Sequence, residues 1–197
     1  NGTTNYILTK MAEEGGSFED MLRQAQELGF AEPDPTFDVD GTDARQKLAI
    51  LSRVAFGSVV RVEQVFREGI GEIDGQDIAF ARELGYTIKL LAVARTIGDR
   101  LEVRVHPAMI PSETLMANIR NEYNAVQVVG DAVGTQVFYG RGAGEMPTAS
   151  AVVSDIVDVA ARRCGGGHRL RSVWAEEERL AVVPMEDVVT SYYFRFI

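Results

Sequence analysis

The amino-acid sequence predicts an α+β fold, with helices packed on one face of a mostly antiparallel mixed sheet. Capped, helix-like segments fill residues 1–56, whereas runs of β-branched residues separated by turn signals dominate residues 86–140. The chain has 197 residues, of which 46% are hydrophobic and 25% are charged, so it is long enough to bury a substantial core.

Three helices are predicted before residue 57, over residues 3–14, 17–28 and 42–56. Ser17 can cap the second helix, with Asp20 three positions later as an acidic form of the capping box. Gly29 is a suitable stop for this helix. The acidic loop at residues 30–41 is expected to stay extended because it contains two prolines.

Two pairs of strand-like segments follow these helices. Gly98-Asp99 separates residues 86–97 from residues 100–110, and this dipeptide predicts a hairpin of two long strands. Residues 125–130 and 135–140 form a second such pair. The other predicted elements are a short strand or extended link at 63–70 and helices at 74–85, at 112–120 and from about Pro147 onward.

Charge and composition exclude several classes of partner. The chain has 20 basic and 29 acidic residues, a formal charge of −9, which argues against a nucleic-acid surface. No apolar run is long enough for a membrane span, and the single cysteine, Cys164, excludes an intramolecular disulfide. We therefore predict a cytoplasmic protein that binds neither nucleic acid nor membrane. Because the sequence lacks an initial methionine and stops in a strand-like run, we expect it to be a piece of a longer protein.

The stretch EPDPTFDVDGTDARQK gathers five carboxylates ahead of Lys47. It can be aligned with a calcium-binding loop, but Thr36 then takes the first ligand position and Lys47 the twelfth, where aspartate and glutamate are needed. A zinc site is not supported either, since His106 and His168 are far apart in sequence and Cys164 has no cysteine partner. The sequence therefore predicts no metal site.

Two interpretations of the lysine stay open at this point. In the first, Asp40 or Thr42 caps a helix, and Asp43 and Lys47 form an ordinary ion pair on its solvent-exposed side, four residues apart. Such a pair would contribute a few tenths of a kcal/mol and would need no function.

In the second interpretation, Lys47 lies at the open end of the face that turns toward the core. A helical step of about 100° per residue directs Ile50, Leu51 and Val54 close to the direction of Lys47. An ammonium group among aliphatic side chains needs a partner, and proteins tolerate one chiefly where it has a task. Lysine and carboxylate together can bind an amino acid and stabilise or protonate an alkoxide, with Glu32 available for an α-ammonium group.

The longer stretch GFAEPDPTFDVDGTDARQKLAILSRVAFG resembles the substrate domain of the homoserine dehydrogenase family, as does NGTTNYIL at the start of the chain. FREGI, IKLLA and FYGRGAGEMPTASAVVSDI follow in the order of that family, so the similarity covers roughly residues 1–160. The resemblance implies reversible reduction of aspartate 4-semialdehyde to homoserine with NAD or NADP, on the route to threonine, methionine and isoleucine. It also implies a homodimer or a tetramer.

Residue roles follow from this resemblance by position. Lys47 matches the catalytic proton donor and acceptor of the family, and Asp43 matches its acidic partner beside the substrate. The substrate contacts implied in the same way are Glu32, which would take the amino group, Asp38, Asp43, Gly2 and Thr3.

The glycine-rich segment YGRGAGEM lacks the third glycine of a dinucleotide fingerprint, because Glu145 occupies that position. It can be a tight strand-to-helix turn or, as the resemblance implies, a segment close to the NAD or NADP. The cofactor neighbours expected in this way are Gly140, Gly142, Ala143, Gly144 and Gly29. The nucleotide-binding domain of the family precedes its substrate domain, so most of the cofactor site would lie before Asn1.

Two regions are therefore predicted. Residues 1–163 would form the substrate-binding and catalytic domain, including a helix that returns toward the nucleotide-binding domain. Residues 164–197 would form a linker and the first strand of a regulatory amino-acid-binding domain. A rival function is a non-catalytic regulatory module that binds an amino acid in the same acidic pocket.

Three polar side chains of the long hairpin are expected to be structural. Lys89 and Arg95 flank an apolar strand and should lie on its solvated side. His106 precedes a proline at the end of a strand and is expected to be a satisfied histidine rather than a catalytic one.

Overall fold

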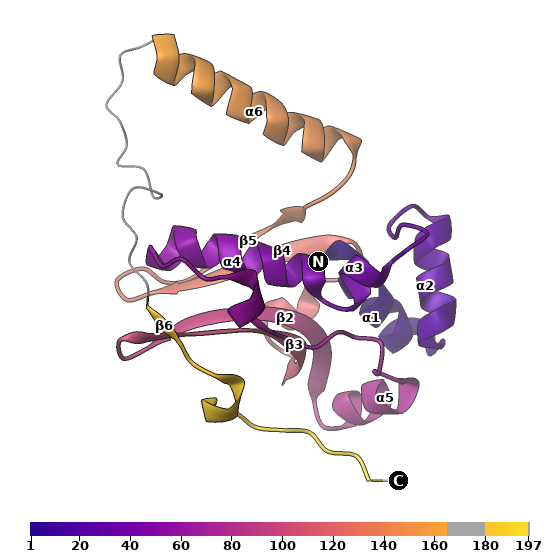
Figure 1. Cartoon of the computed structure of the whole chain (residues 1–197). Coiled ribbons are helices and arrows are strands. Elements are labelled where there is room, and N and C mark those ends of the chain that lie inside the picture. Colours follow the sequence, from indigo (N-terminus) through magenta and orange to yellow (C-terminus); the bar gives the residue numbers. More distant parts are fainter. Residues whose placement is uncertain (165–179, 197) are drawn as a thin grey trace.

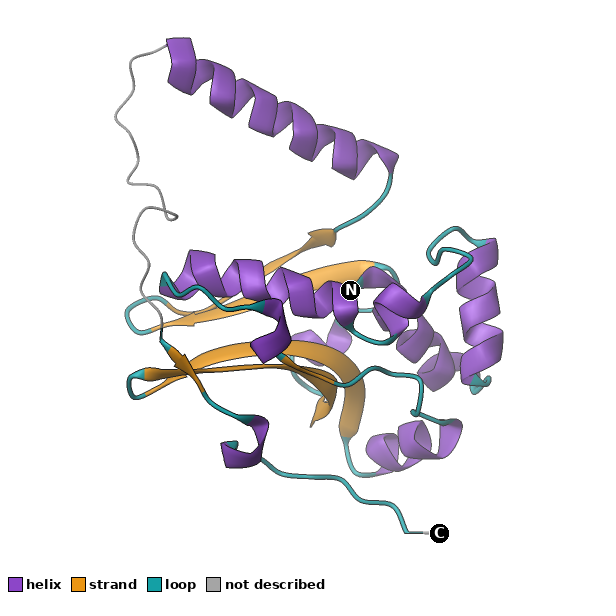
Figure 2. Ribbon diagram, viewed as in Figure 1, coloured by secondary structure: helices purple, strands orange, loops and turns teal. Residues whose placement is uncertain are grey.

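A computed structural model describes residues 1–164 and 180–196 of the chain, so the first part of the predicted linker, residues 165–179, lies outside the described residues. The predicted mixed α+β fold is confirmed (Figures 1 and 2). The α-helices are α1 (Gly2–Glu14), α2 (Phe18–Glu27), α3 (Thr36–Val39), α4 (Thr42–Phe56), α5 (Gly75–Glu83) and α6 (Glu145–Cys164). The strands are β1 (Phe66–Arg67), β2 (Tyr86–Ile97), β3 (Arg100–Pro111), β4 (Tyr123–Gly130), β5 (Gly134–Arg141) and β6 (Ala181–Val182). Short 3₁₀ turns are η1 (Val62–Gln64), η2 (Met116–Asn118) and η3 (Met185–Asp187).

The central sheet is built on the long β2–β3 hairpin. Antiparallel pairing runs from Tyr86 opposite Pro111 to Ile97 opposite Arg100, and Gly98 has a positive φ of 60° in the turn. The predicted hairpin is therefore confirmed. β1 and β6 both pair with β3 in parallel, so the sheet is mixed, with the strand order β1-β3-β2.

Two hydrophobic clusters join the helices to this sheet. In one cluster, Ile7, Leu8 and Met11 of α1 pack with residues of α2, α5 and the β2–β3 hairpin. In the other, Ala44 and Leu48 of α4 pack against aliphatic side chains of β3. Figure 1 shows α4 lying along the sheet, with its start close to the start of α1. The scaffold thereby brings the first turns of these two helices together.

Local capping chemistry sets several helix boundaries as predicted. Ser17 Oγ accepts a hydrogen bond from the backbone N–H of Asp20 at 3.1 Å and begins α2. The helix predicted at 74–85 is α5, which begins after Asp74, and the Asp74 carboxylate accepts two backbone N–H hydrogen bonds. The bounds of α4, Thr42–Phe56, are those predicted, but the predicted cap by Asp40 or Thr42 is wrong, because the N-cap is Gly41 and it makes no side-chain capping hydrogen bond.

The prediction of a helix at residues 112–120 is wrong. This segment contains only the 3₁₀ turn η2. The side-chain Nδ2 of Asn118 donates to the carbonyl oxygens of Ser112 at 2.9 Å and Thr114 at 2.8 Å. Such side-chain to backbone bonds compete with helical hydrogen bonding and close the segment into a turn.

The acidic loop is not extended throughout, as had been predicted, because it contains the short helix α3. The Asp34 carboxylate accepts a hydrogen bond from the backbone N–H of Thr36 at 3.1 Å, which starts the turn. Proline is well tolerated immediately before or at the start of a helix, where no intrahelical N–H bond is lost. The prolines therefore define where α3 begins instead of preventing it.

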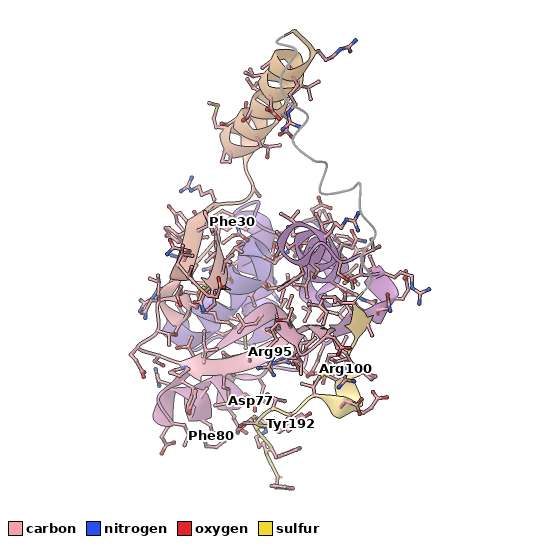
Figure 3. The ribbon with its side chains drawn as sticks, turned by 90° about the vertical axis from the view of Figure 1, so that its left-hand side faces the viewer. Phe30, Asp77, Phe80, Arg95, Arg100 and Tyr192 are labelled. Atoms are coloured by element: carbon pink, nitrogen blue, oxygen red, sulfur yellow. The ribbon has the colours of Figure 1, made fainter. Side chains whose placement is uncertain are left out.

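The long hairpin carries buried polar groups. Lys89 is only 7% exposed, so the prediction of a solvated side chain is wrong for this residue. Arg95 is about half exposed and pairs with the buried Glu102 at 2.8 Å, and Figure 3 shows it on the side of the hairpin where the C-terminal segment passes. His106 Nε2 lies 2.8 Å from Nε of Arg104, and its other ring nitrogen lies 2.7 Å from a backbone carbonyl oxygen, which confirms a satisfied histidine.

The predicted pairing of residues 125–130 with residues 135–140 is confirmed as the β4–β5 hairpin, which forms a separate two-stranded sheet and leads into α6. α6 begins at Glu145, so Pro147 lies in its first turn. Figure 1 shows α6 standing away from the other elements, and almost all of its side chains from residue 145 to residue 163 are exposed. Among the residues described, no helix has both the length and the apolar character needed to cross a membrane.

Candidate active site

The first turn of α1 meets the acidic loop through Asn1. Its Oδ1 accepts a hydrogen bond from the backbone N–H of Thr4 at 3.1 Å and caps α1. Its Nδ2 donates to Oδ1 of Asp38 at 2.6 Å and to Oδ2 of Asp43 at 2.7 Å. One side chain thus starts a helix and joins two carboxylates.

Thr3 and Lys47 extend this network on either side. The hydroxyl of Thr3 lies 2.7 Å from Oδ2 of Asp38 and 2.7 Å from the carbonyl oxygen of Phe30. Lys47 Nζ donates to Oδ2 of Asp43 at 2.6 Å. Burial alone would raise the pKa of the Asp43 carboxyl, but the hydrogen bonds from Lys47 and Asn1 outweigh burial and hold that pKa below its ordinary value. Asp43 is therefore an ionised partner for the ammonium group.

The orientation predicted for α4 is wrong in one respect. The side chain of Lys47 is 62% exposed, and Ile50, Leu51 and Val54 on the same face are also exposed. The face buried against β3 carries smaller side chains, among them Ala44. α4 therefore has apolar side chains on two faces, and the face with Ala44 and Leu48 lies on the sheet. Lys47 is held by Asp43 and not by burial.

The two remaining aspartates of the loop, Asp34 and Asp40, form local turns. Asp34 forms the turn before α3, and Asp40 Oδ1 accepts a hydrogen bond from the backbone N–H of Thr42 at 2.8 Å. Asp40 also pairs with Arg67 of β1. In the part of the chain that the structure describes, no three histidine, cysteine, aspartate or glutamate side chains converge as a metal site would require.

A cleft with a volume of about 620 Å³ opens beside this network, between the start of α1, the acidic loop and the β5–α6 turn. It is lined by the predicted residues Gly2, Thr3, Gly29, Glu32, Asp38, Asp43, Lys47, Gly142, Ala143 and Gly144. Gly140 lies outside the lining, in β5 opposite Asn124. Glu32 is exposed at the cleft, and its carboxylate has no hydrogen-bond or ion-pair partner among residues 1–164 and 180–196. The cleft is strongly acidic apart from Lys47 and one arginine.

Sequence reasoning missed several residues of the cleft. Asn1 carried a signal, because an asparagine directly before a helix is a favoured cap. Arg141 lies between the predicted Gly140 and Gly142, whereas Glu122 and Asn124 had no signal, because they reach the cleft only through the distant β4–β5 hairpin. Arg141 Nη2 lies 3.2 Å from Glu122 Oε1, so the second cation of the cleft is paired with an acid.

Comparison with known sequences matches this arrangement to one family. A family model described as homoserine dehydrogenase matches residues 1–157. The chain is 46% identical to a homoserine dehydrogenase of Neisseria gonorrhoeae, over 99% of this chain and 46% of that protein. It is 52% identical to a homoserine dehydrogenase of Bacillus subtilis, over 81% of this chain and 37% of that protein. The chain therefore spans about half the length of these relatives or less.

Solved structures agree with the sequence matches. A homoserine dehydrogenase from Thiobacillus denitrificans superposes with a TM-score of 0.90 at 47% identity, over 95% of this chain and 44% of that chain. A hyperthermophilic archaeal homoserine dehydrogenase mutant in complex with NADPH gives a TM-score of 0.65 at 30% identity, over 82% of this chain and 46% of that chain.

Proposed function

The chain belongs to the homoserine dehydrogenase family, and from this premise we propose that it forms the substrate-binding half of an active site. The full-length protein would interconvert aspartate 4-semialdehyde and L-homoserine with NAD or NADP. The observation that carries the proposal is the Lys47–Asp43 pair beside a cleft of about 620 Å³. In the test, the full-length protein reduces the semialdehyde with NADH or NADPH, and no turnover with either cofactor would contradict the proposal.

The charges of the cleft suit an amino acid with a reactive carbonyl group. Glu32 has a free carboxylate at the cleft and would take the α-ammonium group of the substrate. Lys47 is the cation at the other side of the acidic network and would meet the aldehyde oxygen. Asp38 and Asp43 accept hydrogen bonds from Asn1 and would hold the substrate and the lysine in fixed positions relative to each other.

Proton transfer is the task proposed for Lys47. A nicotinamide bound by the full-length protein would supply the hydride to the aldehyde carbon, or would accept it from the alcohol in the reverse direction. As the carbonyl oxygen gains negative charge, Lys47 Nζ donates a proton to it and forms the hydroxyl group. In the oxidation direction, the neutral amine takes that proton back. Asp43 stays ionised throughout and fixes the position of Nζ.

The β5–α6 turn fits the nicotinamide end of a cofactor better than the pyrophosphate end. Gly142, Ala143 and Gly144 line the cleft with little or no side chain, so a flat ring could approach the backbone there. A Cβ added at Gly142 would lie 2.7 Å from Nδ2 of Asn124, so a larger residue would disturb this wall. The carboxylates of the cleft, Glu122 among them, would repel a pyrophosphate. The phosphates would therefore lie on the nucleotide-binding domain, and nothing in these residues separates NAD from NADP.

Two exposed apolar faces suit contact with that domain. One is the outer face of α4, with Ile50, Leu51 and Val54 beside Lys47. The other lies on α6, where Val153 and Ile156 are also exposed. Contiguous apolar patches of this kind usually mark contacts with another body. We place the nucleotide-binding half of the full-length protein against both faces, where it would cover Lys47 and close the cleft.

It follows that the 197-residue chain alone should not turn over aspartate 4-semialdehyde, because it lacks most of the cofactor site. The measurement is NAD(P)H consumption by the isolated chain, beside the full-length protein at equal molar concentration. A rate near that of the full-length protein would reject the division of the active site between two halves.

Replacement of Asp43 by asparagine in the full-length protein should lower kcat/KM by roughly 10- to 150-fold. This range corresponds to the loss of about 1.5–3 kcal/mol, the usual strength of a hydrogen bond to a charged group. The measurement is the steady-state rate of homoserine oxidation. Asp99→Asn is the matched control, since Asp99 lies exposed in the β2–β3 turn, and it should leave kcat/KM within about twofold. A similar loss in both variants would remove Asp43 from the site.

Assembly and regulation belong to the full-length protein. Val129, Val133 and Phe138 are exposed on the β4–β5 hairpin, and they suit a contact between subunits of a homodimer or tetramer. Residues 164–197 would lead into a regulatory domain, and a cytoplasmic location stays a prediction.

The alternative of a non-catalytic module has no support, because the relatives matched here are all named as dehydrogenases.

A further inference from the structure

Lys89 of β2 is a buried ammonium group away from the proton-transfer residues. Its Nζ donates to Oδ1 of Asn5 at 2.7 Å and to the carbonyl oxygen of Ile119 at 2.5 Å. Both of these partners are neutral oxygen atoms, not carboxylates. Burial, helped by the charge of Arg120 and opposed by that of Glu13, lowers the pKa of Lys89 to about 8, which still leaves it mostly protonated at pH 7. An ammonium group that is buried with only neutral partners lowers the stability of the fold, so we expect Lys89 to have a specific role.

Asn5, the partner of Lys89 on α1, also forms hydrogen bonds to a turn of the chain. Asn5 Nδ2 donates to the carbonyl oxygens of Asn121 at 2.9 Å and Tyr123 at 3.1 Å. Asn121 has a positive φ of 56°, a left-handed conformation that non-glycine residues adopt at some cost. The backbone N–H of Asn121 also donates to Thr9 Oγ1 at 3.3 Å. Successive turns of α1 therefore hold one turn of the chain, which we call the cleft turn (residues 119–124).

The cleft turn forms part of the wall of the active site. Glu122 and Asn124 both line the cleft. A Cβ added at Gly2 would lie only 2.8 Å from the carbonyl oxygen of Glu122, so the turn rests directly on the first turn of α1. Asn124 in turn underlies Gly142, where the chain leaves β5. A displacement of the cleft turn would move this wall relative to the network at the start of α1.

We propose that Lys89 and Asn5 are positioning residues that fasten the cleft turn to α1 and so set the substrate-binding wall of the cleft. Lys89 joins β2, α1 and the backbone at Ile119 with two short hydrogen bonds. Asn5 passes this constraint to the two carbonyl groups that flank Glu122. Lys89 does not touch the cleft itself, and its effect on catalysis rests on the function proposed above.

The first test needs no enzyme activity. In the full-length protein, Lys89→Met keeps the length of the side chain but removes its hydrogen bonds. Asn5→Ala removes the hydrogen bonds from Asn5 to the cleft turn. Both variants should speed amide hydrogen exchange in the cleft turn at least about tenfold, with unchanged exchange in the β2–β3 turn. Lys10→Met on the partly exposed face of α1 is the matched control and should change neither. Unchanged exchange in the cleft turn would overturn the proposal, and Asn5→Ala decides alone if Lys89→Met does not fold.

The second test separates positioning from chemistry. Both variants should raise KM for homoserine at least about fivefold while kcat stays within about threefold, because the wall binds substrate and transition state alike. A loss confined to kcat, or no kinetic change, would overturn the link to the cleft. If the parent protein itself fails to oxidise homoserine, the proposed function fails, whereas the exchange experiment still tests the fastening.

Discussion

Lys47→Ala in the full-length protein lowers kcat for homoserine oxidation by roughly 10²- to 10⁴-fold, the usual contribution of a positioned acid or base. The variant keeps Asp43, Asn1 and the fold of α4, because the Lys47 side chain is 62% exposed and contributes little to the core. KM should change much less than kcat, since the ammonium acts mainly where charge develops on the oxygen. The measurement is steady-state oxidation with saturating cofactor. A fall of less than about tenfold would exclude Lys47 from the chemistry.

Two further variants sharpen this result. Lys47→Arg keeps the positive charge but cannot deprotonate near neutral pH, so it should also lose at least about a hundredfold in kcat. A non-catalytic site that needs only a cation would tolerate arginine. Lys10→Ala is the matched control, because Lys10 forms an exposed ion pair with Glu14 at 2.8 Å on α1, and it should retain full activity.

Gly69→Ala should destabilise the full-length protein and damage the cleft together. A Cβ at this position would lie 2.5 Å from the carbonyl oxygen of Val39 and 2.6 Å from Cα of Asp40. Both are backbone atoms, so no side-chain rotation relieves the clash. Overpacking of this kind costs about 1–3 kcal/mol, which corresponds to a fall of roughly 2–12 °C in Tm of the domain. The displaced segment also holds Asp38, so KM for homoserine should rise.

Gly71→Ala is the matched control for this experiment. A Cβ at Gly71 would meet no atom within 4 Å, and its backbone does not have positive φ. Its effect on the free energy of unfolding should stay within about 0.5 kcal/mol. Thermal unfolding and steady-state kinetics of both variants give the comparison. Equal effects at the two positions would mean that the acidic loop does not depend on this close approach.

Features encoded within a few neighbouring residues could be predicted from the sequence. The cap at Ser17 and the hairpin turn at Gly98 are examples, because each depends on one side chain or one backbone conformation. The Lys47–Asp43 pair was also predictable, since helical geometry places residues four apart together.

Features that depend on packing partners could not be predicted in this way. The hydrophobicity of α4 did not reveal that Ala44 faces the sheet while Ile50 faces outward, because both stripes are apolar. Lys89 lies on a strand whose pattern allowed a solvated side chain, and only the arrival of Asn5 and residue 119 explains its burial. Asn124 reached the cleft through the path of a distant hairpin.

The hydrogen bonds of the Asn1 side chain have a consequence for heat inactivation. Because one amide group both begins α1 and bridges Asp38 and Asp43, fraying of a single helical turn would remove the bridge between these two carboxylates. The full-length protein would then lose activity at a lower temperature than the one at which its helical circular-dichroism signal is lost. Substrate or product that bridges the same groups would postpone this early loss without raising the temperature at which the sheet melts.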